Sequence, residues 1–153
     1  MNKENVLKSL RFNFITSIFS AVIAIAAFET GYLTKGVLAM NLGEQDIYYI
    51  EVSAIMLTIA IVPFAIKGFS RAMNKVAGQD NITVLKLYGK KSIQRMFLLF
   101  IALVVNIFVY YGIKYDGAIY CGIVCLGALI YSYPTEKVLK YYLEGNQTKR
   151  LRI

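Results

Sequence analysis

Two carboxylates inside long apolar stretches are the residues of this sequence best placed to do chemistry. Glu29 lies in FNFITSIFSAVIAIAAFETGYLT, and Glu51 lies near the start of YYIEVSAIMLTIAIVPFAIKGF. A titratable group is expensive to bury in hydrocarbon, so inside a membrane span it is a functional candidate by default. At such a position a carboxylate accepts a proton or concentrates cations, which is the chemistry of a transporter.

Helix geometry places both carboxylates near the same membrane boundary. At about 1.5 Å per residue, Glu51 lies roughly 24 Å from Lys67, and Glu29 lies roughly 27 Å from Arg11. The hydrocarbon core of a bilayer is about 30 Å thick. Both acids are therefore expected at or just inside the outer boundary, away from the midplane.

The two acids lie on different kinds of helix face. Glu51 shares its face with small or weakly polar residues, a pattern suited to helix packing: Ala54, Thr58, Val62 and Ala65. Glu29 lies opposite the small residues of its own stretch. We therefore expect Glu51 to face the interior of a bundle and Glu29 to reach toward headgroups or a loop.

A candidate polar track extends from Glu51 to three further side chains. It consists of Glu51, Thr58, Asn106 and Tyr110. Asn106 lies about 16 Å past Arg95 along a helix, near the middle of its apolar stretch. An amide at that depth needs a partner. It either contacts a substrate or ion, or forms an interhelical hydrogen bond worth roughly 0.6–2 kcal/mol.

The residues available exclude most catalytic chemistry. Histidine is absent, which removes catalytic triads and di-histidine cofactor sites. Cys121 and Cys125 are four residues apart, so a helix holds their Cβ atoms about 5–6 Å apart, too far for a disulfide. We interpret them as small packing residues. With no glycine-rich phosphate loop and no metal-ligand cluster in the sequence, we expect no catalytic, cofactor-binding or metal-binding residues and no enzymatic activity.

The elements that must position these side chains are transmembrane helices. Hydrophobic residues make up 58% of the 153 residues and charged residues only 17%, which is unlike a soluble domain of this size. Predominantly apolar runs of about 20 residues indicate spans, and we predict four: 12–34, 47–69, 93–113 and 117–135. The expected fold is all-α, a single membrane domain over residues 1–153 that forms a four-helix transmembrane bundle of two hairpins.

Basic residues predict the orientation of this bundle. Of the 17 Lys and Arg residues, fifteen fall before the first span, between the second and third, or after the fourth. Lys and Arg in short loops are retained in the cytoplasm. We therefore expect a multi-pass protein of the cell (inner or plasma) membrane with both termini cytoplasmic, a basic cytoplasmic loop at 67–92 and a basic C-terminal tail at 136–153.

The charge distribution indicates the partners. The net charge of +8 falls between apolar blocks, a pattern that favours anionic lipid headgroups over nucleic acid. The candidate contacts for anionic lipid, or for an acidic partner protein, are Lys86, Lys90, Lys91 and Arg95. The second partner that we expect is another membrane protein or a further copy of this chain.

Two functions are compatible with these observations. The first is a non-enzymatic accessory or assembly subunit of a membrane complex, favoured by the missing catalytic groups and the small-residue packing stripes. The alternative is a small oligomeric transporter or channel for an ion or small solute, with Glu51 at its outer mouth. An enzyme that acts on lipid through Glu, Asp, Lys or Tyr is a third interpretation, which nothing in the residue spacing favours.

Overall fold

All regular structure in the described part of the chain is helical. The structure is a computed structural model that describes residues 3–76 and 79–150, with side chains described as far as residue 144. The helices are α1 (Lys3–Glu29), α2 (Val37–Asn41), α3 (Glu44–Lys75), α4 (Asn81–Ile113), α5 (Asp116–Tyr131) and α6 (Glu136–Arg150). The expected all-α class is therefore confirmed for these residues.

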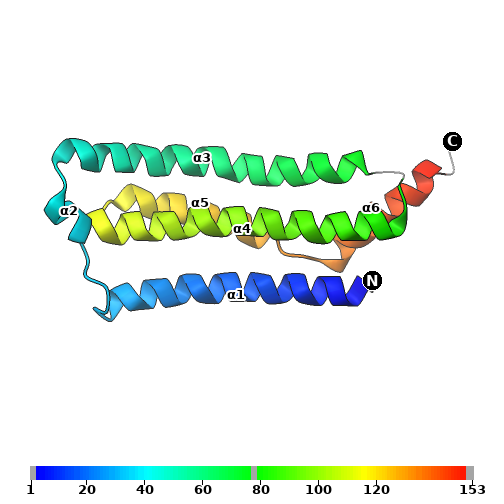
Figure 1. The fold of residues 1–153 in the computed structure, drawn as a ribbon, viewed down its shortest axis with the longest axis horizontal. Coiled ribbons are helices and arrows are strands. Elements are labelled where there is room, and N and C mark those ends of the chain that lie inside the picture. The colour runs from blue at the N-terminus through cyan, green and yellow to red at the C-terminus, as the bar shows by residue number, and fades with distance from the viewer. Residues whose placement is uncertain (1–2, 77–78, 151–153) are drawn as a thin grey trace.

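Helix α4 is the common packing partner of the other long helices. Figure 1 shows α4 between α1 and α3, with α5 alongside it. Fifteen of the 33 residues of α4 are buried, against four of the 27 residues of α1. Leu99 and Ala102 of α4 are completely inaccessible. Most of the inner surface of the bundle thus belongs to α4, whereas α1 lies at the periphery and packs mainly on α4.

Among the described residues, three helices are long and apolar enough to cross a membrane: α1, α3 and α4. Helix α5 has 16 residues and is therefore about 24 Å long, shorter than a hydrocarbon core of about 30 Å. Together with the first part of α6 it makes a pair that is bent by 58° and is apolar enough for one broken span. The chain is thus a membrane-embedded helical protein with three or four spanning helices.

The helix in the predicted fourth span, 117–135, ends earlier than expected. It stops at Tyr131, and residues 132–135 separate it from α6. Pro134 explains the break, because proline lacks an N–H group and disfavours helical backbone at the residue before it.

The hydrophilic stretch 67–92, expected as a loop, is helical over most of its length. Helix α3 continues to Lys75, and α4 begins at Asn81 with Asp80 in the N-cap position. The residues after Asp80, whose alternation of apolar and basic side chains predicts a short amphipathic segment, form the first part of α4. The predicted basic tail 136–153 likewise begins with a helix, α6. Lys, Arg, Leu, Met and Ala are good helix formers, so helices rich in them continue beyond the apolar segment.

The end of α1 is set by a glycine in the left-handed conformation. Gly31 has φ +81°, and its N–H donates to the carbonyl of Phe28 at 3.4 Å, as in a glycine-terminated helix. Farther along the connection, the N–H of Gly36 donates to the carbonyl of Tyr111 at 2.8 Å. The chain between α1 and α3 is thereby fixed to the last turn of α4.

The antiparallel order of the helices collects positive charge at one end of the bundle. The start of α1, the end of α3, the start of α4 and α6 all lie at the same end, on the right in Figure 1. Most of the basic residues of the chain belong to these segments. We call this end the basic end.

The burial pattern of α4 predicts a contrast between two methionines. Met96 of α4 is 2% exposed, whereas Met56 of α3 is 63% exposed. Truncation of a buried methionine leaves a cavity, so Met96→Ala is expected to lower the free energy of unfolding by about 2 kcal/mol or more, and Met56→Ala by well under 1 kcal/mol. Equilibrium unfolding of both variants in detergent micelles measures the difference. Equal losses would contradict the placement of α4 inside the bundle.

Candidate functional site

A buried polar pair joins α3 to α4 at the middle of the bundle. Asn106 is completely inaccessible, and its Nδ2 donates to Oγ1 of Thr58 and to the carbonyl of Ala102, each at 2.8 Å. Thr58 is 4% exposed and donates in turn to the carbonyl of Ala54 at 3.0 Å. Asn106 therefore forms the interhelical hydrogen bond that is one of the two roles expected for it. Oδ1 of Asn106 is buried, and no described residue donates a hydrogen bond to it.

Tyr110 lies next to this pair, but Glu51 does not. Tyr110 follows Asn106 by one turn of α4, and both residues line an apolar groove between α1, α4 and α5. Glu51 precedes Thr58 by seven residues, or roughly 10 Å along α3. It is half-buried, and no described residue forms a hydrogen bond or ion pair with it. Of the candidate polar track, the structure brings Thr58, Asn106 and Tyr110 together and leaves Glu51 apart.

The small-residue stripe expected beside Glu51 does face the bundle. Ala54, Thr58 and Ala65 are buried, with exposed fractions of 3–4%, and Val62 is half-buried. On α5, Cys125 is completely inaccessible and Cys121 is half-buried. The interpretation of Cys125 as a packing residue is thus confirmed; it forms no disulfide, and its Sγ lies 4.0 Å from Nδ2 of Asn106.

Glu29 has partners that the sequence alone did not identify. Its Oε2 accepts from Nζ of Lys35 at 2.7 Å, and its Oε1 accepts from the hydroxyl of Tyr111 at 2.8 Å. The ring of Phe28 stacks on Tyr111 with 4.6 Å between centroids. This cluster fixes the end of α1 to the last turns of α4. Glu29 therefore reaches a loop residue, one of the two outcomes expected for it, and also binds a second helix.

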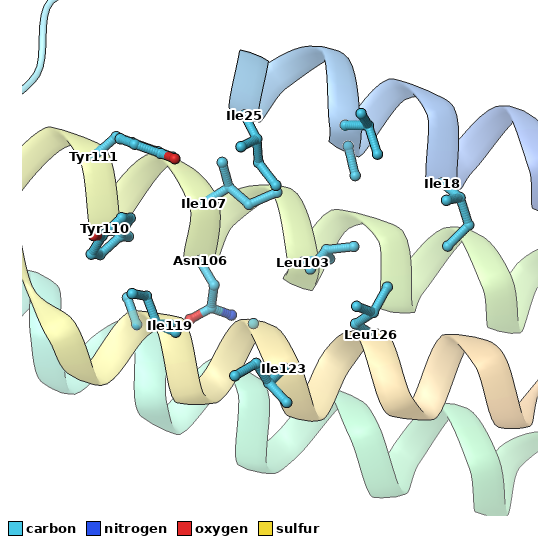
Figure 2. A pocket seen from close by; sticks show the side chains of 14 residues that line it. Ile18, Ile25, Leu103, Asn106, Ile107, Tyr110, Tyr111, Ile119, Ile123 and Leu126 are labelled. Atoms are coloured by element: carbon cyan, nitrogen blue, oxygen red, sulfur yellow. The ribbon is translucent and has the colours of Figure 1, made fainter. Parts of the chain in front are cut away.

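An apolar groove opens between α1, α4 and α5 on the far side of the polar pair from α3. Its volume is about 440 Å³. Figure 2 shows Ile18 and Ile25 of α1, Leu103 and Ile107 of α4, and Ile119, Ile123 and Leu126 of α5 around this space. Asn106 lies at its floor, between α4 and α5, and Tyr110 and Tyr111 lie toward one end. We call it the lateral groove.

The four basic candidates lie on two different sides of α4. Lys86 and Lys90 border a groove against the first turns of α1, beside Asn5 and Ser9. The other two, Lys91 and Arg95, border a cavity against α3. The four basic residues, which are close together in the sequence, therefore border two separate cavities in the structure.

Arg95 is the buried member of the basic set. Only 8% of the residue is exposed. Its Nη2 donates to the carbonyl of Ser132 at 2.9 Å, and its guanidinium lies 4.1 Å from the centroid of the Phe69 ring. The contact with Ser132 connects α4 to the end of α5. No signal in the sequence distinguishes this arginine from the exposed basic residues around it.

The described residues include no group of three His, Cys, Asp or Glu side chains close enough to hold a metal ion. The polar groups that meet at the centre of the bundle are the amide of Asn106, the hydroxyl of Thr58 and the thiol of Cys125, and Nδ2 of the amide contacts both of the others. Their chemistry is hydrogen bonding, which serves helix association or the recognition of a polar group.

Comparisons with protein-family models, with curated proteins and with solved structures found no match to this chain.

The polar pair predicts a specific loss of stability. Thr58→Val keeps the shape of the side chain and removes the acceptor of Asn106, so the free energy of unfolding is expected to fall by about 0.6–2 kcal/mol. Thr16→Val, at an exposed position of α1, is the matched control and is expected to change it by less than about 0.5 kcal/mol. Unfolding in detergent micelles compares the two. The same small change in both variants would show that the Thr58–Asn106 bond contributes nothing.

Proposed function

We propose that this protein is a non-enzymatic accessory or assembly subunit of a membrane complex and that its lateral groove receives a transmembrane helix of the partner. The observation that carries the proposal is the groove itself, an opening between spanning helices that is lined almost entirely by apolar side chains. Inside a bilayer, such an opening is filled by lipid chains or by another helix.

The lining of the groove favours a helix. Small residues occur on two of its walls, Ala21 on α1 and Ala118 and Gly122 on α5. Small residues let helix backbones approach closely, which is how helices associate in membranes. At the floor, Oδ1 of Asn106 is without a described partner. A serine, threonine or amide side chain of an incoming helix would satisfy this acceptor after a small shift of the side chains above it.

The peripheral position of α1 supports the same interpretation. Half of its large apolar side chains are exposed, including Phe12, Ile15, Phe19 and Ile23. The main packing partner of α1 within the chain is α4. A helix seated in the lateral groove would contact α1 and α5 together and would add a second neighbour to α1.

One observation favours the transport alternative: the polar side chains of Thr58 and Asn106 are in contact inside the bundle. Both residues are buried and hydrogen-bonded to each other, and Glu51 lies apart from them. A transport path needs polar groups in a continuous, accessible series. We therefore rank transport second.

The proposed location is the cell membrane, with the basic end of the bundle in the cytoplasm. Lys and Arg near the ends of spans are retained on that side, and anionic headgroups there attract exposed lysines. Lys86 and Lys90 are exposed at this end and are the proposed contacts with such headgroups.

Two glycines of α5 provide a matched test of the groove. A Cβ at Gly122 meets Asn106 and Leu103 at ordinary contact distances, so a leucine there fits the helix and projects into the groove. A Cβ at Gly127 meets nothing within 4 Å, and Gly127 does not line the groove. In mild-detergent affinity purification, the unaltered protein is expected to recover a membrane partner in stoichiometric amount. Gly122→Leu should reduce that recovery at least tenfold, and Gly127→Leu should leave it unchanged.

A photo-activated cross-linker locates the contact. Placed at Ile123, which lines the groove, it should form an adduct with the same partner; placed at Ile130, which is exposed elsewhere on α5, it should not. Recovery of the protein alone, or equal recovery with both glycine variants, would contradict the proposed role.

A further inference from the structure

We propose that the cavity between α3 and α4 at the basic end is a binding site for a phosphate group, held by Arg95 and Lys91. The cavity is lined by Phe64, Ala65, Gly68 and Phe69 of α3 and by Lys91, Gln94, Arg95 and Leu98 of α4. This site goes beyond the proposed subunit role and does not depend on it. The lateral groove and this cavity share no residue.

The first argument is an unbalanced buried charge. A buried ion is costly unless it is paired and hydrogen-bonded. Glu136 pairs with Arg11 and Glu29 pairs with Lys35, and no ion pair joins a described carboxylate to Arg95. Nη2 of Arg95 has one neutral acceptor, the carbonyl of Ser132, and Nε is buried without any described acceptor. The positive charge of Arg95 is thus left without an anion.

The contacts that Arg95 does make orient its guanidinium. The ring of Phe69 covers one face of the guanidinium at 4.1 Å, and Ser132 holds one of its nitrogens. A guanidinium presents its donors in a planar fork that matches the oxygens of a phosphate. Nη1 also has no described partner. Once the side chain shifts slightly toward the cavity, Nη1 and Nε can donate hydrogen bonds to such a ligand.

The second argument is the chemistry and size of the cavity. Its volume is about 80 Å³, which is two to three times the roughly 30 Å³ that one water occupies in the liquid and suits a group of a few heavy atoms. Lys91 adds a second positive charge to the wall, and its Nζ donates to Oε1 of Gln94 at 2.9 Å. Phe64 and Leu98 make the remaining wall apolar. A ligand that joins an anionic group to an apolar body would contact both the basic part and the apolar part of the wall.

The third argument is depth. Arg95 precedes Ile113, the last residue of α4, by eighteen residues, or about 27 Å of helix. Because the hydrocarbon core is about 30 Å thick, a protein whose α4 ends at one boundary holds Arg95 near the other. The phosphates of lipid headgroups lie at that level. A free phosphate anion offers the same oxygens, and the experiment below separates the two sources.

The space for the ligand is provided at Gly68. A Cβ at this position meets nothing within 4 Å, so the helix accommodates a larger side chain there. Because Gly68 lines the cavity, that side chain takes up part of the open space. Gly68→Leu therefore blocks the site without removing any contact of Arg95. A loss of phosphate binding in this variant is therefore not caused by a loss of the structural contact between Arg95 and Ser132, because the variant leaves that contact in place.

Native mass spectrometry of the purified full-length protein in a neutral detergent tests the proposal. The probes are phosphatidylglycerol, the matching diacylglycerol without phosphate, and inorganic phosphate. We expect phosphatidylglycerol to bind at least tenfold more tightly than diacylglycerol. Gly68→Leu and Lys91→Gln should each weaken that binding at least tenfold, and Arg95→Lys, which keeps the charge but loses the fork, should weaken it several-fold.

The controls are Gly127→Leu for added volume and Lys75→Gln for lost charge, at exposed positions that line none of the cavities described above. Both should bind phosphatidylglycerol as the unaltered protein does. Thermal unfolding without lipid identifies any variant that fails to fold. If Arg95→Lys does not fold, the proposal is tested with Gly68→Leu and Lys91→Gln alone.

Competition by millimolar inorganic phosphate would support the proposal and identify a free anion as the ligand, whereas tight lipid binding without such competition would support it and identify the headgroup. Unaltered lipid binding by Gly68→Leu and Lys91→Gln would overturn it. An equal loss in Lys75→Gln would also overturn it, since attraction to net charge would then explain the binding.

Discussion

The packing of α4 against α1, α3 and α5 is the interaction on which the rest of the structure depends. Within hydrocarbon, the backbone polar groups are satisfied inside each helix, so helices associate through close side-chain packing and occasional hydrogen bonds. Helix α4 offers inaccessible side chains such as Leu99 and Ala102 to its neighbours. The connection to α3 includes the Thr58–Asn106 bond, and the connection to α5 includes the Arg95–Ser132 bond. Both polar contacts are made by residues of α4.

The two proposed sites arise where this packing is incomplete. Because α1 packs mainly on α4, the space between α1 and α5 stays open as the lateral groove. On the α3 side, the missing side chain of Gly68 leaves room beside Arg95. In each place a buried polar atom lacks a described partner, Oδ1 of Asn106 in the first and Nε of Arg95 in the second. A helix and a phosphate are the respective ligands that supply the missing chemistry.

The membrane-embedded helical class was predictable from the sequence because long apolar runs have few alternatives in a protein of this composition. The packing stripes near Thr58 and Cys125 were also predictable, since their small residues repeat with the helical period. Helix boundaries were less predictable: the amphipathic pattern after Asp80 does not show that α4 runs unbroken from Asn81 into the apolar segment, and the apolar run 117–135 does not show the break at Pro134 between α5 and α6. The burial of Arg95 and the partners of Glu29 depend on contacts between distant segments, which helical periodicity does not encode. For the same reason, Lys90 and Lys91 are adjacent in sequence but border different cavities.

The central position of α4 is tested most directly by a scan of lipid accessibility. Single nitroxide labels would be placed along residues 12–25 of α1 and 96–108 of α4, in a protein with Cys121 and Cys125 replaced by alanine, and their collision rate with oxygen measured in lipid nanodiscs. The account predicts high rates at most positions of α1 but only along a narrow stripe of α4 that includes Phe97, Ile101 and Phe108, where α4 is exposed. Rates on α4 as broadly high as those on α1 would contradict it.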